Sequence, residues 1–548
     1  MIDTWFGRDG AETLGFVHLP AAGAHAGVVI CPPLGYEQFN AYRAMRFLGQ
    51  ELEARGIAAV RFDYAGEGDA VGDPGRPDAV ELWLRSVADA VSLLRDAGVP
   101  RIALLGLSSG ALIAAEGARR SGTDALVLWD PSFSGRRFLR RQRTLSDLVV
   151  APEAAGANPV LSTTLHQQVA HWIDAQRIDA DTLAPVDAPV LVLGRASAAR
   201  IPDLGAGVDV RVVDGQEELL DVSSAVAAIP TATVAEIVEW VDTRLAGEPH
   251  PVHLTPRTEV EVGRTPDGEP VVERLSRRGP QSLFTIETAP ARSPATRGAV
   301  LLQPAAAEHR ASAGRFQVRI ARDLAARGFR ALRFDRRITG DSTVVVPGEH
   351  NLVLTEAWVE DADALVAELR EPRLALVGIC AGAWVSARVA ATRPTQLAVL
   401  VGPNYWRTQP MQPDAYAKLV LETGGVEPRI AGLKGFVRDS IPNWLWRMLA
   451  PSQLFNNPAT LLSSPAPRAG AIALLMPPED AVTFERNRGA DAVARLRSQG
   501  ADVRVAAYEE GDHAMFGEAL QARALADIVW LLDEHMPAAA PHVAMTAT

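Results

Sequence analysis

The stretch Leu374-Ala375-Leu376-Val377-Gly378-Ile379-Cys380-Ala381-Gly382 decides how this chain folds. Its four leading apolar residues predict a buried strand, and a helical run from Ala383 to Ala391 follows the second glycine. A nucleophile on so tight a strand-to-helix turn has strained backbone, so the residues two before and two after it must be glycine or very small. The turn also places Cys380 at a helix N-terminus, which favours the thiolate. We interpret Cys380 as a nucleophile; the alternative is a small buried core cysteine.

The same turn occurs twice, because the chain is an internal repeat. A shift of 272 residues, the separation of Ser108 from Cys380, lays Gly106-Leu107-Ser108-Ser109-Gly110 over the cysteine turn. The same shift lays Arg61-Phe62-Asp63 over Arg333-Phe334-Asp335. One offset held at distant positions indicates a duplicated domain.

Each copy alternates short apolar runs with helical patterns. In the second copy we expect strands at 299–302, 330–335 and 374–377, separated by helices at 316–327 and 357–369. Strand, helix, strand at these spacings predicts a parallel sheet with right-handed crossovers. The predicted fold class is therefore α/β, with two tandem domains, each a mostly parallel sheet flanked by helices.

The domain boundaries follow from composition. We expect the first copy at 1–249, the second at 250–536, and a disordered tail rich in alanine and proline at 537–548. Residues 258–277 alternate around Pro266-Asp267-Gly268, a hairpin signal with no counterpart before Met1. The halves are expected to pack as a pseudo-twofold dimer within one chain.

An insert in each copy, at 132–187 and at 404–467, is of the kind that forms a helical cap over a substrate pocket. The second insert contains a set of large apolar side chains that would form cap core or line an apolar acyl site: Tyr405, Trp406, Phe436, Trp444, Trp446, Met448 and Phe455. The first insert instead gathers five arginines: Arg136, Arg137, Arg140, Arg141 and Arg143. We interpret these as a solvated charge run; the alternative is a docking site for a carrier protein or the phosphates of CoA.

A base and an acid for Cys380 are found in the order nucleophile, acid, histidine. His513 follows the last predicted strand, 503–507, and is the candidate base; the alternative is an inert surface histidine. Asp480, after the predicted strand 472–476, is the candidate acid, with Glu479 as the alternative.

An oxyanion hole requires two backbone donors. Ala381, the residue after the nucleophile, would supply one N–H group. Ala305, in the loop after the first core parallel strand, would supply the other.

Both halves resemble the α/β-hydrolase superfamily over almost the whole chain, with the glycine-flanked turn and the late histidine as the specific marks. The Gly-x-Cys-x-Gly variant is similar to dienelactone hydrolases, polyhydroxyalkanoate synthases and some cysteine thioesterases. The resemblance implies an acyl-cysteine intermediate, no metal and no organic cofactor. The loop Gln303-Pro304-Ala305 departs from the His-Gly usual in that family, which leaves its geometry open.

The first copy lacks a base, an acid and a donor at the matching places. No histidine occurs between His171 and His250, and Pro33 has no N–H group to donate. A serine hydroxyl without a base is a weak nucleophile. We therefore expect Ser108, the possible second site, to be inactive unless His166 or His171 reaches it.

Composition narrows the partners. A net charge of -12 argues against nucleic acid. Two cysteines, Cys31 and Cys380, make neither a disulfide framework nor a thiolate metal cluster, and no signal or membrane span is visible, so we expect a cytoplasmic enzyme without a membrane partner. The expected ligand is a small acyl ester or thioester, free or linked to CoA or a carrier protein. Two hypotheses remain: an acyl-transfer enzyme (hydrolase, thioesterase or acyltransferase), or a pseudo-hydrolase that acts as a binding or scaffolding module.

Overall fold

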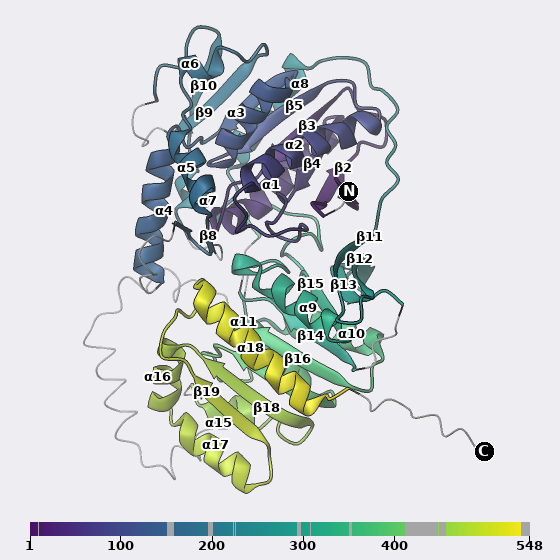
Figure 1. Ribbon diagram of the computed structural model, residues 1–548, viewed down its shortest axis with the longest axis vertical. Helices are drawn as coiled ribbons and strands as arrows, with labels where there is room; N and C mark the ends of the chain where they lie inside the picture. Colours follow the sequence, from purple (N-terminus) through teal and green to yellow (C-terminus); the bar gives the residue numbers. More distant parts are fainter. Residues whose placement is uncertain are drawn as a thin grey trace, which may run out of the picture.

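Two sheets, one in each copy of the repeat, organise the chain into an upper and a lower lobe (Figure 1). The computed structural model describes all residues except 9, 151–157, 196–200, 223, 225, 293–296, 307, 350–352, 412–447, 449–455 and 539–548. The expected disordered tail lies almost wholly outside the described residues.

The first sheet has the order β1-β2-β4-β3-β5-β6-β9-β10. Its strands are β1 (Ile2–Phe6), β2 (Thr13–His18), β3 (Ala26–Cys31), β4 (Ile57–Phe62), β5 (Ile102–Leu107), β6 (Ala125–Trp129), β9 (Val190–Arg195) and β10 (Val208–Val213). Only β1 and β2 pair antiparallel with their neighbours. The central strands are continuous apolar runs because helices cover both faces of the sheet: α1 (Glu37–Ala54) and α8 (Thr231–Arg244) pack on one face, α2 (Ala79–Asp96) and α3 (Gly110–Ser121) on the other.

The first insert contains helices and a small hairpin. It consists of α4 (Gly135–Val149), β7 (Pro159–Val160), β8 (Thr163–Thr164), α5 (Gln167–Ala175) and α6 (Ala180–Leu183), and α7 (Glu217–Leu220) follows β10. The arginines of α4 are partly paired: Arg136 binds Asp174 and Arg141 binds Asp221, while Arg137 and Arg140 are exposed. This arrangement fits a solvated charge run.

The second sheet repeats the first and adds one edge strand, in the order β11-β12-β13-β15-β14-β16-β17-β18-β19. Its strands are β11 (Glu259–Arg264), β12 (Pro270–Arg278), β13 (Leu283–Pro290), β14 (Ala299–Gln303), β15 (Arg330–Phe334), β16 (Leu374–Ile379), β17 (Thr395–Val401), β18 (Ala469–Met476) and β19 (Val503–Ala507). Its helices are η1 (Ala313–Arg315), α9 (Phe316–Ala326), α10 (Glu356–Leu369), α11 (Ala381–Ala390), α15 (Pro458–Leu462), α16 (Pro478–Arg486), α17 (Gly489–Ser498) and α18 (Glu518–His535). The predicted fold class, two tandem α/β-hydrolase domains, is confirmed.

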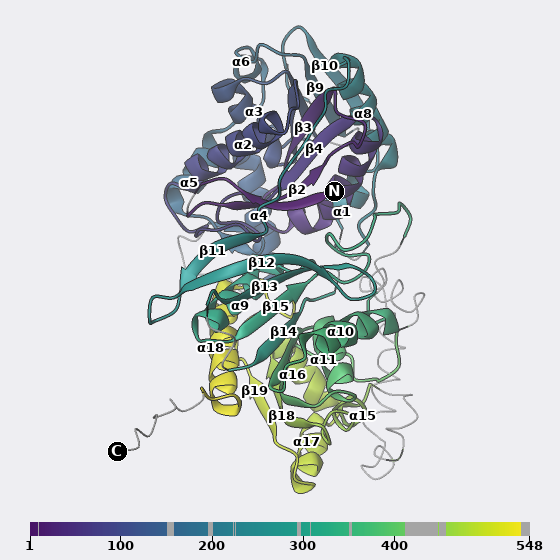
Figure 2. The ribbon, with the colours of Figure 1, turned by 90° about the vertical axis from the view of Figure 1, so that its right-hand side faces the viewer.

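The predicted hairpin at 258–277 exists as β11 and β12, and only its second strand has a counterpart in the first copy. β12 is the counterpart of β1, since each stands beside the next antiparallel strand in the same place in its sheet. Only β11 is extra. Figure 2 shows that β11 and β12 lie against the first copy, where Val260 and Leu275 share an apolar cluster with Trp5 and Phe16.

Most of the second insert lies outside the described residues, and with it Phe436, Trp444, Trp446 and Phe455. The described part places Trp406 in the core, with its ring centroid 5.5 Å from that of Phe484. Tyr405 is half-buried beside Trp384. In the described residues, no helix combines the length and apolar character needed to cross a membrane.

Buried charges join the two copies. Arg61 of the first copy binds Asp341 of the second with an N–O distance of 2.6 Å, and Arg333 of the second binds Asp69 of the first. Each pair is the image of the other under the 272-residue shift, the pattern that two-fold packing produces. All four side chains are almost completely buried.

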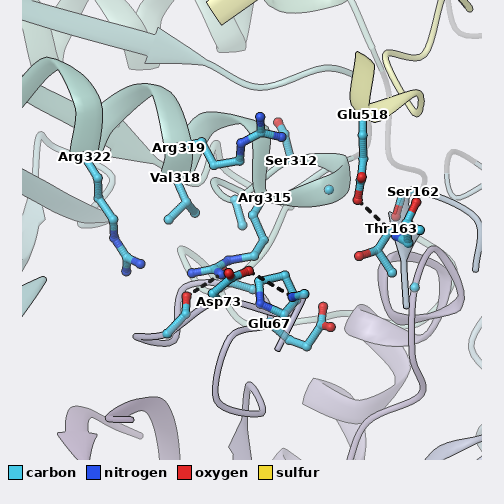
Figure 3. Close-up of a pocket in the computed structure, with 18 of the residues that line it drawn as sticks. Glu67, Asp73, Ser162, Thr163, Ser312, Arg315, Val318, Arg319, Arg322 and Glu518 are labelled. Atoms are coloured by element: carbon cyan, nitrogen blue, oxygen red, sulfur yellow. Dashed lines mark hydrogen bonds between the residues drawn. The ribbon is translucent and has the colours of Figure 1, made fainter. Parts of the chain in front are cut away.

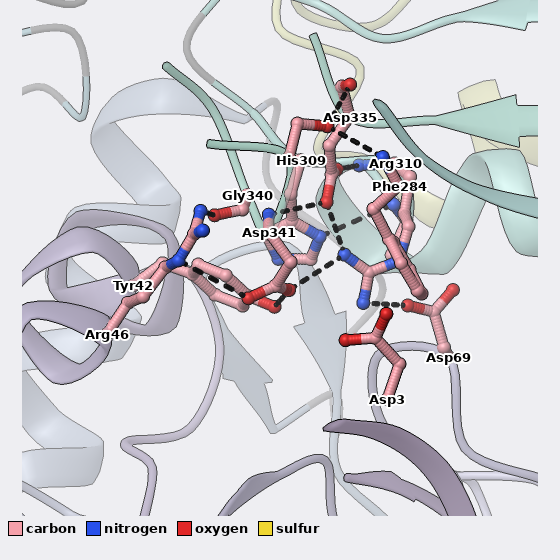
Figure 4. Close-up of polar contacts among 12 residues, drawn as sticks. Asp3, Tyr42, Arg46, Asp69, Phe284, His309, Arg310, Asp335, Gly340 and Asp341 are labelled. Atoms are coloured by element: carbon pink, nitrogen blue, oxygen red, sulfur yellow. Dashed lines mark hydrogen bonds and ion pairs between the residues drawn. The ribbon is translucent and has the colours of Figure 1, made fainter. Parts of the chain in front are cut away.

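Arg310 is the centre of this network (Figure 4). Its guanidinium lies 2.8 Å from Asp69, 2.6 Å from Asp335 and 3.2 Å from Asp341. Desolvation opposes a buried arginine, but these carboxylates raise the pKa of Arg310 well above its ordinary value. Buried arginine and aspartate side chains from the two copies therefore neutralise one another at the interface, and neither copy could bury its own charges alone.

Replacing Arg310 with methionine should destabilise the chain strongly, because three buried carboxylates would lose a shared cation. We expect the free energy of unfolding, measured by urea denaturation, to fall by about 3–5 kcal/mol. Arg274→Met, which breaks the more exposed pair with Glu259, should lower it by no more than about 1 kcal/mol. Equal, small losses in both variants would contradict the assigned role of Arg310.

Candidate active site

The predicted turn after β16 has the expected strained geometry. Cys380 adopts φ +51° and ψ −113°, and Ser108 in the first copy adopts φ +52°. The Cys380 N–H group donates to the carbonyl oxygen of Val401 at 2.8 Å. A Cβ on Gly382 would lie only 2.4 Å from the carbonyl oxygen of Gln303, so close packing of helix α11 on β14 requires glycine here. The turn thus presents the sulfur at the carboxyl edge of the sheet.

His513 and Asp480 lie beside Cys380. The Nε2 atom of His513 is 3.2 Å from the Cys380 Sγ atom, and its Nδ1 atom is 2.9 Å from both carboxylate oxygens of Asp480. Asp480 is buried in the first turn of α16, whereas the alternative acid, Glu479, is exposed. The three predicted side chains therefore form a continuous line from sulfur to carboxylate.

The surroundings of His513 favour its protonated form. Burial by itself would lower the pKa of His513, but interaction with Cys380 and the hydrogen bond to Asp480 raise that pKa well above 6.5. The raised pKa of His513 means that its protonated form stabilises the folded chain. This contribution to stability is complete below about pH 6.5, the pKa of histidine in the unfolded chain, and is lost as pH rises through the higher pKa of His513 in the folded chain.

Gly402 provides the space for the histidine and the acid. It has φ +58°, and a Cβ there would lie 3.2 Å from Asp480 and 3.7 Å from His513. The matching residue of the first copy is Asp130, which also has positive φ and binds Arg195 at 2.6 Å. Where the second copy has an acid and a histidine, the first copy thus has an ion pair.

The oxyanion loop after β14 is held by Arg336. The Nη2 atom of this buried side chain donates to the carbonyl oxygens of Ala305 and Ala306, each at 2.5 Å, and the guanidinium lies 3.6 Å from the centroid of the Trp358 ring. Burial lowers the pKa of Arg336 to about 9, against the opposing charges of Glu308 and Cys380. Arg336 fixes the backbone of Ala305, the candidate second donor.

The first copy indicates a further candidate donor. There the Leu34 N–H group donates to the Ser109 hydroxyl at 2.9 Å. The 272-residue shift matches Leu34 with Ala306 and Ser109 with Ala381. Because Ala381 has no hydroxyl, the N–H group of Ala306 cannot donate to it in this way. Ala306 joins Ala305 and Ala381 as a candidate oxyanion donor.

Ser108 faces a carboxylate rather than a histidine. Its hydroxyl donates to Glu37 at 2.6 Å, and Gln142 binds the other oxygen of that carboxylate at 2.9 Å. Burial raises the pKa of Glu37, with Arg141 opposing. His166 caps helix α5, and His171 lies in a groove with Arg136 and Arg140. The polar groups around Ser108 are therefore engaged in a structural network.

Sequence reasoning missed Arg336, Gly402, Ala306 and Asn404. The Asn404 side-chain amide lies 3.1 Å from Nε2 of His513, next to the contact of that atom with the sulfur. The repeat offset could have identified Gly402, since it stands opposite an aspartate in the first copy; no pattern pointed to the other three. Among the described residues, no group of three or more histidine, cysteine or acidic side chains is arranged to hold a metal ion.

Comparison with known proteins agrees with this fold. The family model "Serine aminopeptidase, S33" matches residues 25–180 and 294–430, just over half of the chain. The chain belongs to this family. The family description refers to serine, which the first copy retains at the turn, whereas the second copy has Cys380.

Solved structures similar to the chain match it at low sequence identity. Est1E from Butyrivibrio proteoclasticus is 15% identical, with 45% of this chain and 100% of that chain covered and a TM-score of 0.34. Proline iminopeptidase from Mycobacterium smegmatis is 17% identical, with 44% and 98% covered and a TM-score of 0.29. Mouse alpha/beta hydrolase domain-containing protein 10 is 16% identical, with 48% and 98% covered and a TM-score of 0.30. No curated protein sequence matches the chain.

Adding a methyl group at position 402 should damage the site without unfolding the lobe. Gly402→Ala places a side chain in left-handed backbone, at a cost of about 1–2 kcal/mol, and against both Asp480 and His513. We expect slower reaction of Cys380 with iodoacetamide and a small fall in melting temperature. Gly348→Ala, also at positive φ but with nothing within 4 Å of the added Cβ, should leave the reaction unchanged. Equal alkylation rates in both variants would contradict this role of Gly402.

The two cysteines should differ sharply in reactivity. Cys31 is fully buried, and burial raises its pKa to about 12, while Cys380 is half-buried beside His513. Iodoacetamide at about pH 7 should alkylate Cys380 and spare Cys31, as peptide mass mapping would show. His513→Ala should slow the labelling of Cys380. Slow labelling of both thiols at the same rate would favour the scaffolding hypothesis.

Proposed function

We propose that the second copy is an acyl-transfer enzyme with a Cys380–His513–Asp480 triad, acting on an ester or thioester through an acyl-cysteine intermediate. The observation that carries the proposal is the 3.2 Å contact between Sγ of Cys380 and Nε2 of His513, with His513 bound in turn to a buried carboxylate. Membership of a hydrolase family supports enzymatic activity.

The reaction has two balanced steps. In the first, the Cys380 thiolate attacks the carbonyl carbon of the acyl group; a carbon–sulfur bond forms, the bond to the leaving oxygen or sulfur breaks, and the proton on His513 passes to the leaving group. In the second, His513 removes a proton from water or another acceptor, which attacks the acyl carbon and releases the thiolate. Backbone N–H groups of Ala381 and of Ala305 or Ala306 stabilise the oxyanion in both steps.

A thioester is the preferred donor on chemical grounds. Attack by a thiolate on a thioester exchanges one carbon–sulfur bond for another, so the intermediate forms at little energetic cost. An oxygen ester must expel a more basic alkoxide, which needs a proton from His513 earlier in the step. The acyl thioester would be free or linked to CoA or a carrier protein. Water or another acceptor would complete the cycle.

The first copy is proposed to be non-catalytic. Its serine donates to Glu37, the amide of Leu34 is occupied by Ser109, and Asp130 and Arg195 form an ion pair where an acid and a histidine would be needed. These three interactions concern three different requirements of the reaction: the nucleophile, the oxyanion donor, and the acid with its histidine. The role of this copy is then structural.

Mass spectrometry of the intact protein after incubation with a panel of acyl thioesters tests the proposal. We expect a single acyl adduct that maps to Cys380 and is absent from Cys380→Ala. His513→Ala should slow turnover by about 10²–10⁴-fold, the usual contribution of a general base. Ser108→Ala should keep turnover within about twofold of the unchanged protein, because its hydroxyl has no histidine as a base. An adduct on Ser108 instead of Cys380 would overturn the assignment.

A further inference from the structure

The loop that carries His513 is held from outside its own domain. It runs from Tyr508 to Gly517, between β19 and α18, and turns sharply at Met515, which has φ +59°. Within the second copy, Asp512 accepts hydrogen bonds from the Phe516 and Gly517 N–H groups at 2.9 and 3.1 Å. These bonds shape the turn. Met515 packs in the core cluster of the second copy, whereas Ala514 and Phe516 belong to a separate cluster.

The first copy contributes to that separate cluster. Phe516 and the half-buried Ala514 belong to a small cluster whose other members are Val150, Leu161 and Tyr36 of the first copy and Ala313 of the second. The Tyr36 ring meets the Phe516 ring edge to face, with centroids 4.9 Å apart. His513 therefore sits in a loop whose neighbouring side chains pack against the other half of the chain.

A second contact fixes the start of helix α18 in the same way. Figure 3 shows Glu518 of α18 pointing at the β7–β8 hairpin of the first copy, where its carboxylate accepts a hydrogen bond from the Thr164 N–H group at 3.0 Å. The loop that carries His513 and the first residue of the helix after it thus both contact the first copy. The residues of Figure 3 line a cavity of about 1220 Å³ between the copies.

Tyr36 is itself held rigidly. Its N–H group donates to the Leu161 carbonyl oxygen at 2.9 Å, and its hydroxyl lies 2.8 Å from that of Ser224. Ser224 belongs to the loop between β10 and α8, the counterpart of the loop that carries His513 in the second copy. The first copy has lost the histidine from that loop and uses the loop to hold a tyrosine.

Burial keeps the phenol of Tyr36 neutral. Burial raises the pKa of Tyr36 to about 12, with further contributions from Glu308 and Cys380. A phenol with this pKa stays neutral over the working range, so Tyr36 acts by packing and not by proton transfer.

We propose that Tyr36 of the first copy is a positioning residue for the active site of the second: through Phe516 it keeps His513 in contact with Cys380. The inference rests on the proposed function, in which His513 serves Cys380. It gives the non-catalytic copy a defined task.

The test is the pH dependence of Cys380 alkylation by iodoacetamide in the full-length chain. Tyr36→Ala should slow alkylation about tenfold at about pH 7, because His513 would no longer be held beside the sulfur. A tenfold change corresponds to the loss of roughly one aromatic pair. At about pH 10, where an accessible thiol ionises unaided, the rate should match the unchanged protein. Tyr36→Phe, which keeps the ring and loses the hydroxyl, should behave as the unchanged protein at both pH values.

Leu161→Ala, in the same cluster, provides a second variant should Tyr36→Ala fold poorly, and it should show the same selective loss near neutral pH. Equal rates for Tyr36→Ala and the unchanged protein at about pH 7 would overturn the inference, as would a loss of equal size at both pH values, which would indicate a damaged fold. His513→Ala separates the two proposals. If it slows alkylation while Tyr36→Ala does not, only the present inference fails; if neither does, the proposed triad fails too.

Discussion

The exchanged arginine–aspartate pairs between the copies are the constraint on which the rest of the structure depends. Apolar surfaces can shift against one another at little energetic cost. A buried guanidinium that moves away from its carboxylate instead leaves two unpaired charges in a low-dielectric interior. Arg61 with Asp341 and Arg333 with Asp69 therefore allow essentially one alignment of the two lobes. That alignment brings Tyr36 against Phe516, and so brings the first copy to the edge of the second copy's site.

A few substitutions account for the difference in function that we propose between the two copies. Both copies retain the strained turn, with positive φ at Ser108 and at Cys380. The difference lies around it: a serine hydroxyl at position 109 occupies an amide that an alanine at 381 leaves open, and an aspartate at 130 stands where Gly402 makes room for a triad. The strained turn is thus kept in the first copy, while the polar partners that the proposed reaction requires are absent or, like the Leu34 N–H group, bound to another side chain.

The sequence was sufficient for the features that depend on local pattern and chain order. The elbow, the sheet topology and the positions of His513 and Asp480 follow from residues whose roles are set within one copy. That β12 is the counterpart of β1 was evident only from the structure, because the match rests on the place of each strand in its sheet. Tyr36 and Arg336 were not foreseen, since their importance arises from contacts across the fold that no spacing encodes.

Duplication within one chain permits an asymmetry that a dimer of identical subunits forbids. Tyr36 and Glu308 occupy the same position in the two copies, and the charge of Glu308 acts on Tyr36. Around the axis of a true homodimer, that position would hold either two phenols or two carboxyl groups, and two buried carboxyl groups repel when ionised. In a fused chain, the two matching positions can change independently. One half of an ancestral pair could become a fixed scaffold while the other kept the chemistry, without either change being copied to its twin.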